Sequence, residues 1–403
     1  MVIFREIIDN LSANVNDNNM LALVHHVKQN VVNEADIAYL ATVLGNSGEK
    51  IRELPPNSLD VASTGGPSSL STLLVPLYLR YLGYIVPKLA VPGRPAGGID
   101  VLATIPGYQI EMDPKDVLSC LLKCGYVHFI AGERYAPLDA KLFQYRKVVG
   151  AESCIPLVVA SLIAKKLAVG LAEVGLDIRV GPHGNFGGSY FEAESNAHLF
   201  NKVAKLVGIK ATCILTDARH PYQPWIGRGE SLVALHELFS GKANALLRSH
   251  SLQCWRMALF STNYNKKIPP PNDSNLKNIF KDNLAAQGSS LSAFEGRVEE
   301  IYKSLKLEIL ANMSGRVVIR QDLLRSILVE SQKRYPSSTG FSDPSGVQLL
   351  VDSGEYVEKD APLAFVRLPQ VLREQLKRFS KAVYVIREPD RSDFPPKLDE
   401  EVI

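Results

Sequence analysis

Three polar side chains lie close together in the sequence around an apolar segment, IPLVVASLIAKKLAV at 155–169. Ser161 and Lys165 are four residues apart, so they share one face if the segment is a helix, and Arg146 precedes them. The hydroxyl can donate or accept a hydrogen bond, the ammonium carries three donors and a charge, and the guanidinium is a planar fork of donors. Together they suit a flat ligand with carbonyl oxygens, such as a nucleobase, or an anion.

The apolar segment itself has helical spacing. Apolar residues recur every three or four positions, Pro156 suits a first turn, and Gly170 can end the helix. A less specific interpretation is that Ser161 fills a buried helix position and that Lys165 extends beside Lys166 to water. The helix alone leaves both interpretations open.

A glycine-containing loop follows a predicted strand at 59–62 and leads into a predicted helix, in LDVASTGGPSSLSTLL. Glycines let the backbone approach an oxyanion closely, and a helix N-terminus supplies unpaired amide groups. The loop is therefore a candidate phosphate cradle, although an ordinary strand-to-helix turn with an N-cap serine fits it equally well. The candidate phosphate-binding residues are Ser63, Thr64, Gly65, Gly66, Ser68, Ser69, Thr72 and, from the next glycine loop, Arg94.

Two further glycine loops follow predicted strands, VPGRPAGGIDVL at 91–102 and VGPHGNFGGSY at 180–190. Three such loops after three strands indicate one edge of a sheet, where open α/β sheets bind their ligands. The guanidinium of Arg94 could reach a phosphate or carboxylate there. His183 could act as an acid or base, but a lone histidine in a loop is more often hydrogen-bonded or solvated.

Composition limits the ligands and the cellular compartment that can be expected for the protein. The 403 residues are 46% hydrophobic and carry a formal charge of +3 from 45 basic and 42 acidic residues, which gives no reason to expect nucleic-acid or membrane binding. The N-terminus has Arg5 and Glu6 where a secretory signal needs an apolar run. Five cysteines fit reduced thiols, and Cys120 and Cys124 lack the second pair that zinc requires. We expect a soluble, cytoplasmic protein without a metal.

Periodicity predicts a small helical bundle at residues 1–45 and then alternating strands and helices. The fold class is therefore α/β: a small all-helical domain, a larger α/β domain with a central mixed sheet, and a C-terminal α+β subdomain. Residues 264–292 are expected to form a connector and residues 387–402 a frayed end. The predicted strands are 59–62, 85–89, 126–130, 176–180 and 211–215, and the predicted helices between them include 114–124 and 192–207.

Several motifs extend through most of the chain. They are STGG at 63–66, IPGY at 105–108, IAGERYAPLDAKLFQYR at 130–146, SCIPLVVASLIAKKLAVGL at 153–171, LTDA at 215–218, AAQG at 285–288 and GVQLLVDSGEYVEKDAPLAFV at 346–366. In these motifs the chain resembles the thymidine (pyrimidine-nucleoside) phosphorylase family, which is related to anthranilate phosphoribosyltransferase.

The resemblance implies two lobes across a cleft, with phosphate on the α/β side and a pyrimidine on the helical side. Arg146, Ser161 and Lys165 fall on the family's base-binding and catalytic positions, with Phe143 and Val158 beside the base. It also implies a homodimer, a small-molecule nucleoside or nucleotide as partner, and phosphate as a co-substrate without any other cofactor. The implied domains are 1–50 and 138–170 (helical), 58–137 and 175–315 (α/β), and 316–403 (α+β).

The chain departs from the family around the phosphate site. The family's lysine and histidine before STGG are replaced by Val61 and Ala62, and the second glycine loop leaves Pro92 and Gly98 where hydroxyls are expected. Losing a lysine aimed at a phosphate weakens binding, because charge-assisted hydrogen bonds are among the strong ones. The expected activity is phosphorolysis of a pyrimidine nucleoside. A phosphoribosyltransferase-type enzyme and a catalytically silent nucleoside-binding homologue are the alternatives.

Overall fold

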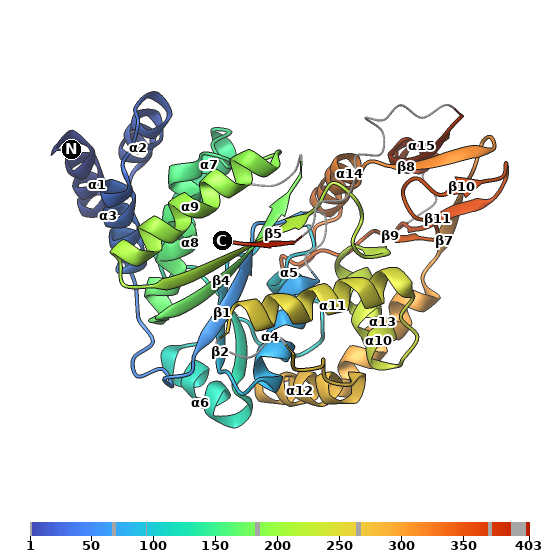
Figure 1. The fold of residues 1–403 in the computed structure, drawn as a ribbon, viewed down its shortest axis with the longest axis horizontal. Coiled ribbons are helices and arrows are strands. Elements are labelled where there is room, and N and C mark those ends of the chain that lie inside the picture. Colours follow the sequence, from blue (N-terminus) through green and yellow to red (C-terminus); the bar gives the residue numbers. More distant parts are fainter. Residues whose placement is uncertain are drawn as a thin grey trace.

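The computed structural model describes residues 2–66, 70–93, 95–181, 186–262, 267–369, 373–387 and 400–403. Ser68, Ser69, Arg94 and His183 lie outside the described residues. Helices at one side, a sheet in the middle and an α+β region at the other side make up the fold (Figure 1). The expected α/β class, with its helical, mixed-sheet and C-terminal α+β parts, is confirmed.

The helical part combines three separate stretches of the chain. The N-terminal helices pack against one another, and the second and third also contact later helices of the chain. Gly45 ends the third helix at a close contact, since a Cβ there would lie 2.7 Å from the main-chain oxygen of Ala164. The helices are α1 Val2–Ala13, α2 Asp17–Gln29, α3 Glu34–Gly45, α7 Pro137–Val148, α8 Ile155–Val169 and α9 Tyr190–Leu206.

The central sheet is parallel apart from its last strand. Strands β1 Leu59–Ser63, β4 Glu173–Val180 and β5 Lys210–Asp217 pair in parallel, and so do β2 Val86–Ala90 and β3 Tyr126–Ile130. A parallel bridge between Ser58 and Ile85 joins the two groups. Because β1, β2 and β4 run in one direction, the glycine loops that follow them start at one edge of the sheet.

The last strand corrects the expectation of a frayed end for residues 401 and 402, while residues 388–399 of that expected segment lie outside the described residues. β13 Glu401–Val402 pairs antiparallel with β5, and the main chains of Ile403 and Cys213 exchange hydrogen bonds of 2.8 and 3.0 Å. Pairing with a sheet edge satisfies backbone groups that polar composition alone would leave to water.

Helices cover the sheet face opposite α8 and α9 (Figure 1). One of them corrects the expected connector at 264–292: Asn272 caps α12, and Leu276, Phe280 and Leu284 recur at four-residue spacing on its buried face. That spacing is a helix signal that the Pro- and Asn-rich composition concealed. These helices are α4 Ser71–Tyr81, α5 Gly98–Leu102, α6 Pro114–Cys124, α10 Arg228–Phe239, α11 Ala245–Phe260, α12 Asp273–Ala286 and α13 Leu291–Lys303.

The C-terminal α+β region contains two antiparallel sheets and a separate hydrophobic core. Gly354 and Asp360 have positive φ angles. Two of the strands, β6 and β7, come from before residue 316, and the domain limits given above remain predictions. The elements are β6 Trp225–Ile226, β7 Lys306–Leu310, β8 Gly315–Ile319, α14 Gln321–Arg334, β9 Gly346–Leu349, β10 Tyr356–Val357, β11 Pro362–Arg367, α15 Arg373–Ala382 and β12 Val383–Ile386.

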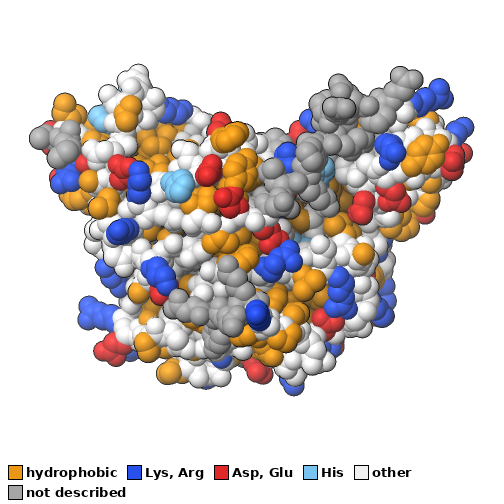
Figure 2. Space-filling view, viewed as in Figure 1, with side chains coloured by type: hydrophobic (Ala, Val, Ile, Leu, Met, Phe, Trp, Pro, Cys, Tyr) orange, Lys and Arg blue, Asp and Glu red, His pale blue; other side chains and the backbone are white. Residues whose placement is uncertain are grey.

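Acidic and basic side chains are interspersed on the face in Figure 2, and that face is hollowed at its upper edge between two arms. None of the described helices has the length and apolar character needed to cross a bilayer. Within the described ranges, no group of three His, Cys, Asp or Glu side chains is arranged to hold a metal, and the five cysteines are free thiols.

Candidate functional site

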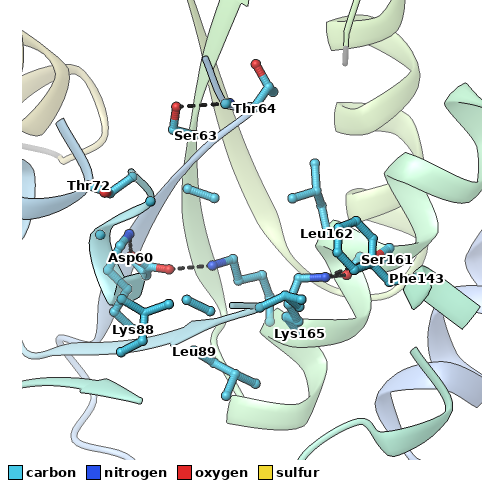
Figure 3. Close-up of a pocket in the computed structure, with 18 of the residues that line it drawn as sticks. Asp60, Ser63, Thr64, Thr72, Lys88, Leu89, Phe143, Ser161, Leu162 and Lys165 are labelled. Atoms are coloured by element: carbon cyan, nitrogen blue, oxygen red, sulfur yellow. Dashed lines mark hydrogen bonds and ion pairs between the residues drawn. The ribbon is translucent and has the colours of Figure 1, made fainter. Parts of the chain in front are cut away.

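A pocket lies where the sheet meets α7 and α8 (Figure 3). The helices supply one wall and the ends of the strands, with their loops, supply the other. Residues far apart in the sequence therefore face the same space. Its lining consists of Asp60, Ala62, Ser63, Thr64, Gly65, Thr72, Lys88, Leu89, Ala90, Val91, Gly97, Gly98, Ile99, Asp100, His128, Phe143, Arg146, Val158, Ser161, Leu162, Lys165 and Lys166.

All five side chains predicted for the base side line this pocket: Phe143, Arg146, Val158, Ser161 and Lys165. The local sequence explains the helix that carries three of them. Proline stands in the first turn of α8, and Gly170 ends the helix in the left-handed conformation at φ 84°.

Lys165 is held at a defined position in the pocket wall. Its ammonium donates to Asp139 Oδ2 at 2.9 Å, to the Ser161 carbonyl at 2.5 Å and to Ser161 Oγ at 2.9 Å. Burial lowers the pKa of Lys165, and the charge of Asp139 partly offsets that effect. Lys165 is only 8% exposed, so the interpretation that its side chain extends to water is wrong.

Arg146 also fastens the wall. Its Nε, Nη1 and Nη2 atoms donate to the main-chain oxygens of Ala151, Leu157 and Glu152 at 3.0, 3.2 and 2.6 Å. These bonds tie the end of α7 to the start of α8, and the side chain is buried. The three nitrogen atoms of the guanidinium thus donate to the backbone, and Arg146 also lines the pocket.

Asp60, Lys88 and Lys166, which sequence analysis did not assign to the site, meet where the sheet faces α8. Asp60 on β1 accepts from Lys88 of β2 at 2.7 Å and, through its other oxygen, from Lys166 of α8. Burial alone would raise the pKa of Asp60, but the two ammonium groups hold it well below its usual value. Lys88 also donates to the carbonyl of Val61 at 2.5 Å.

A histidine lies next to Lys88. His128 on β3 is the register partner of Lys88, and the two side chains therefore share a face of the sheet. His128 Nδ1 is 3.2 Å from the Tyr126 hydroxyl, whereas the buried Nε2 has no hydrogen-bond partner among the described residues. Burial, followed by the charge of Lys88, keeps the pKa of His128 well below its usual value.

The glycine loop contributes Ser63, Thr64, Gly65 and Thr72 to the pocket lining. Gly65 and Gly66 have φ angles of 113° and 141°, a backbone conformation that favours glycine, and Gly66 is buried outside the lining. The Thr64 hydroxyl accepts a hydrogen bond of 2.9 Å from the main-chain N–H of Arg179, so it also anchors the loop to β4. Four predicted phosphate-side residues thus meet the base-side wall.

Sequence analysis missed Asp60, Lys88, His128 and Lys166. One signal was present: a lysine in the middle of IVPKLA and a histidine in the middle of YVHFI interrupt strands that are otherwise apolar. Ionisable residues are seldom buried unless they are paired, so such positions indicate a partner or a ligand.

No family model matches the chain. A pyrimidine-nucleoside phosphorylase of Staphylococcus epidermidis is 31% identical over 206 residues, which are 50% of this chain and 47% of that protein. A thymidine phosphorylase of Mycobacterium tuberculosis is 28% identical over 285 residues, which are 69% of this chain and 66% of that protein.

The aligned part of the chain spans about half the length of the pyrimidine-nucleoside phosphorylases that it matches. Among solved structures, anthranilate phosphoribosyltransferase from Thermus thermophilus aligns with a TM-score of 0.47 at 13% identity, over 74% of this chain and 98% of that one. In sequence the chain is similar to pyrimidine-nucleoside and thymidine phosphorylases, at 28–31% identity.

Proposed function

We propose that the protein is a pentosyltransferase that cleaves a pyrimidine nucleoside with phosphate, giving the free base and a pentose 1-phosphate. One observation carries the proposal: the α7–α8 wall with Ser161 and Lys165 and the glycine loop with Ser63 and Thr72 border the same pocket. A single small molecule placed there contacts both. The relatives described above support the same class of chemistry.

The proposed reaction transfers the pentose from the base to phosphate. A phosphate oxygen forms a bond to the anomeric carbon while the bond from that carbon to the ring nitrogen breaks, and the bonding electron pair goes to the base. Negative charge then grows on the ring nitrogen and carbonyl oxygens, and the ring nitrogen finally takes up the proton of the hydrogenphosphate, so that the neutral free base is formed. The cations of Lys165 and Arg146 stabilise this charge most when it is largest, which lowers the barrier.

Positioning supplies much of the rate in such a site. Lys165 is held by Asp139 and Ser161, so little reorganisation is needed when charge develops. Phe143 and Val158 offer apolar contact to a flat ring. No covalent intermediate with the protein is required, and phosphate serves as the co-substrate.

The test is to incubate the purified protein with uridine, thymidine and cytidine, with and without inorganic phosphate or diphosphate, and to measure free base. Base release that depends on phosphate supports phosphorolysis. Release that requires diphosphate instead favours the phosphoribosyltransferase alternative. The replacement of the family's lysine and histidine by Val61 and Ala62 is compatible with that alternative. Nucleoside binding without release under either condition favours a catalytically silent homologue.

A further inference from the structure

Around Asp60, where β1 and β2 face α8, the described side chains carry more positive than negative charge. Asp60 offers one carboxylate to two buried lysines, Lys88 and Lys166, which are each 3% exposed. The other two acidic groups nearby are engaged by arginines: Asp100 by Arg228 at 3.2 Å, and Asp177 by an Arg179 bond of 2.8 Å.

A buried excess of positive charge is costly unless an anion compensates it. The cluster of Asp60, Lys88 and Lys166 borders a pocket and is not enclosed in the core, so a ligand can supply that anion. Lys88 is particularly well placed, because it lies against the carbonyl of Val61, at the start of the glycine loop. The expected lysine is absent from position 61, but a different lysine reaches the same stretch of backbone from the neighbouring strand.

His128 adds an independent observation. Its Nε2 is a buried polar atom without a hydrogen-bond partner among the described residues, and the histidine is 1% exposed. The Cε1 edge of the ring, next to Nε2, faces Gly98, where an added Cβ would lie 2.7 Å from Cε1 and 2.5 Å from Thr72 Oγ1. His128, Thr72 and Gly98 therefore meet at one place in the pocket lining.

The chemistry of the imidazole suits an oxyanion. If the Tyr126 hydroxyl donates to Nδ1, the neutral tautomer carries its proton on Nε2, which then becomes a donor. A donor next to an ammonium, both buried and in register on adjacent strands, is an arrangement that binds phosphate oxygens by charge-assisted hydrogen bonds.

We infer that Lys88 and His128 form an oxyanion-binding end of the pocket that holds the phosphate or diphosphate group of the co-substrate. Lys88 supplies the positive charge that the lysine absent from position 61 would have supplied, and His128 adds a second donor. This inference rests on the proposed function for the identity of the co-substrate. The anion binding itself can be measured without turnover.

The experiment is calorimetric titration of the protein with inorganic phosphate and, separately, with diphosphate. Lys88→Met keeps the length of the stem without the charge, and His128→Leu leaves both Asp60 ion pairs in place. Each change is expected to weaken anion binding about tenfold or more, the usual effect of losing a charge-assisted hydrogen bond. Lys123→Met, at an exposed position on α6, is the matched control and should bind as the wild type does.

Binding of uracil or thymine is measured in the same proteins and is expected to change less than threefold, which separates local loss from unfolding. The tighter of the two anions identifies the co-substrate, and either preference supports the oxyanion site. Wild-type anion affinity in a folded Lys88→Met or His128→Leu protein would overturn the assignment of that residue. Absence of anion binding to the unmodified protein would overturn the whole inference. Failure of the proposed function is a separate result, because it is a lack of base release.

Discussion

The ammonium of Lys165 lies 2.9 Å from Asp139 Oδ2, and both side chains are buried in the wall of the pocket. Burial disfavours the charged form of the lysine, and the carboxylate restores much of it. Asp139 thus maintains a cation at the place where the proposed reaction develops negative charge. It acts on the reaction through Lys165, as a positioning residue.

Asp139→Asn is expected to lower the pKa of Lys165 further, because the change removes the nearby negative charge. The alkaline limb of the pH–rate profile should then move to lower pH, and breaking the buried pair should cost about 3–5 kcal/mol of unfolding free energy. Rates of base release as a function of pH, together with urea unfolding, measure both effects. Asp282→Asn, at an exposed position on α12, is the control. An unshifted alkaline limb in the folded variant would remove Asp139 from this role.

Arg146→Met is expected to destabilise the fold as well as to lower turnover. The change leaves three main-chain oxygens, those of Ala151, Glu152 and Leu157, without the bonds from Arg146, which should cost about 2–4 kcal/mol. Urea unfolding monitored by circular dichroism measures this loss. Arg134→Met removes an exposed arginine just before the same helix and should leave the unfolding midpoint unchanged. Equal midpoints for the two variants would contradict the fastening role of Arg146.

The sequence predicts the α7–α8 wall of the pocket because the features of its main helix are local. Helical spacing, Pro156 and Gly170 define α8, and four-residue spacing places Ser161 and Lys165 on one face. The Asp60 cluster depends instead on the order of strands in the sheet. Lys88 meets Asp60 only because β2 and β1 are neighbours, and His128 meets Lys88 only through the register of β2 and β3. A single sequence does not contain those long-range contacts in an explicit form.

The same distinction explains two errors in the predicted elements. The Pro- and Asn-rich composition at 264–292 led to the prediction of a connector in place of α12. In the structure, Leu276, Phe280 and Leu284 form the buried face of that helix and pack into the core. The polar C-terminal residues form β13 only because an edge of β5 is available to pair with them. Tertiary contacts decided both outcomes.

His250 should make stability depend on pH. Burial, followed by the charge of Arg179, lowers the pKa of His250 from 6.5 to about 3. Below pH 6.5 the unfolded chain takes up a proton that the folded chain excludes, so stability falls as the pH falls from 6.5 towards 3, by about 1.4 kcal/mol per pH unit. His250→Gln should remove that part of the slope in urea unfolding measured between pH 6.5 and 4. The control is His25→Gln, at an exposed position, which should keep the wild-type dependence of stability on pH. The same dependence in His250→Gln would contradict the role of His250.

Gly98→Ala is expected to weaken phosphate binding by about tenfold, because the new methyl group must displace Thr72 Oγ1 or His128 from the pocket lining. The control is Gly296→Ala in α13, where an added Cβ meets no atom within 4 Å. That change should leave phosphate binding unaltered and stabilise the helix by up to about 1 kcal/mol. Phosphate titration of both variants decides the matter. An unchanged affinity of Gly98→Ala for phosphate would show that Thr72 and His128 do not contact the anion.

The central claim is that one pocket binds the nucleoside and phosphate together. Its most direct test is the release of free base from uridine or thymidine by wild-type protein and by Lys165→Met, with phosphate present or omitted. The account predicts release by the wild type only when phosphate is present, and at least about a tenfold lower rate in the folded variant. Absence of base release from every pyrimidine nucleoside, release that needs diphosphate and not phosphate, or a wild-type rate in folded Lys165→Met would contradict it.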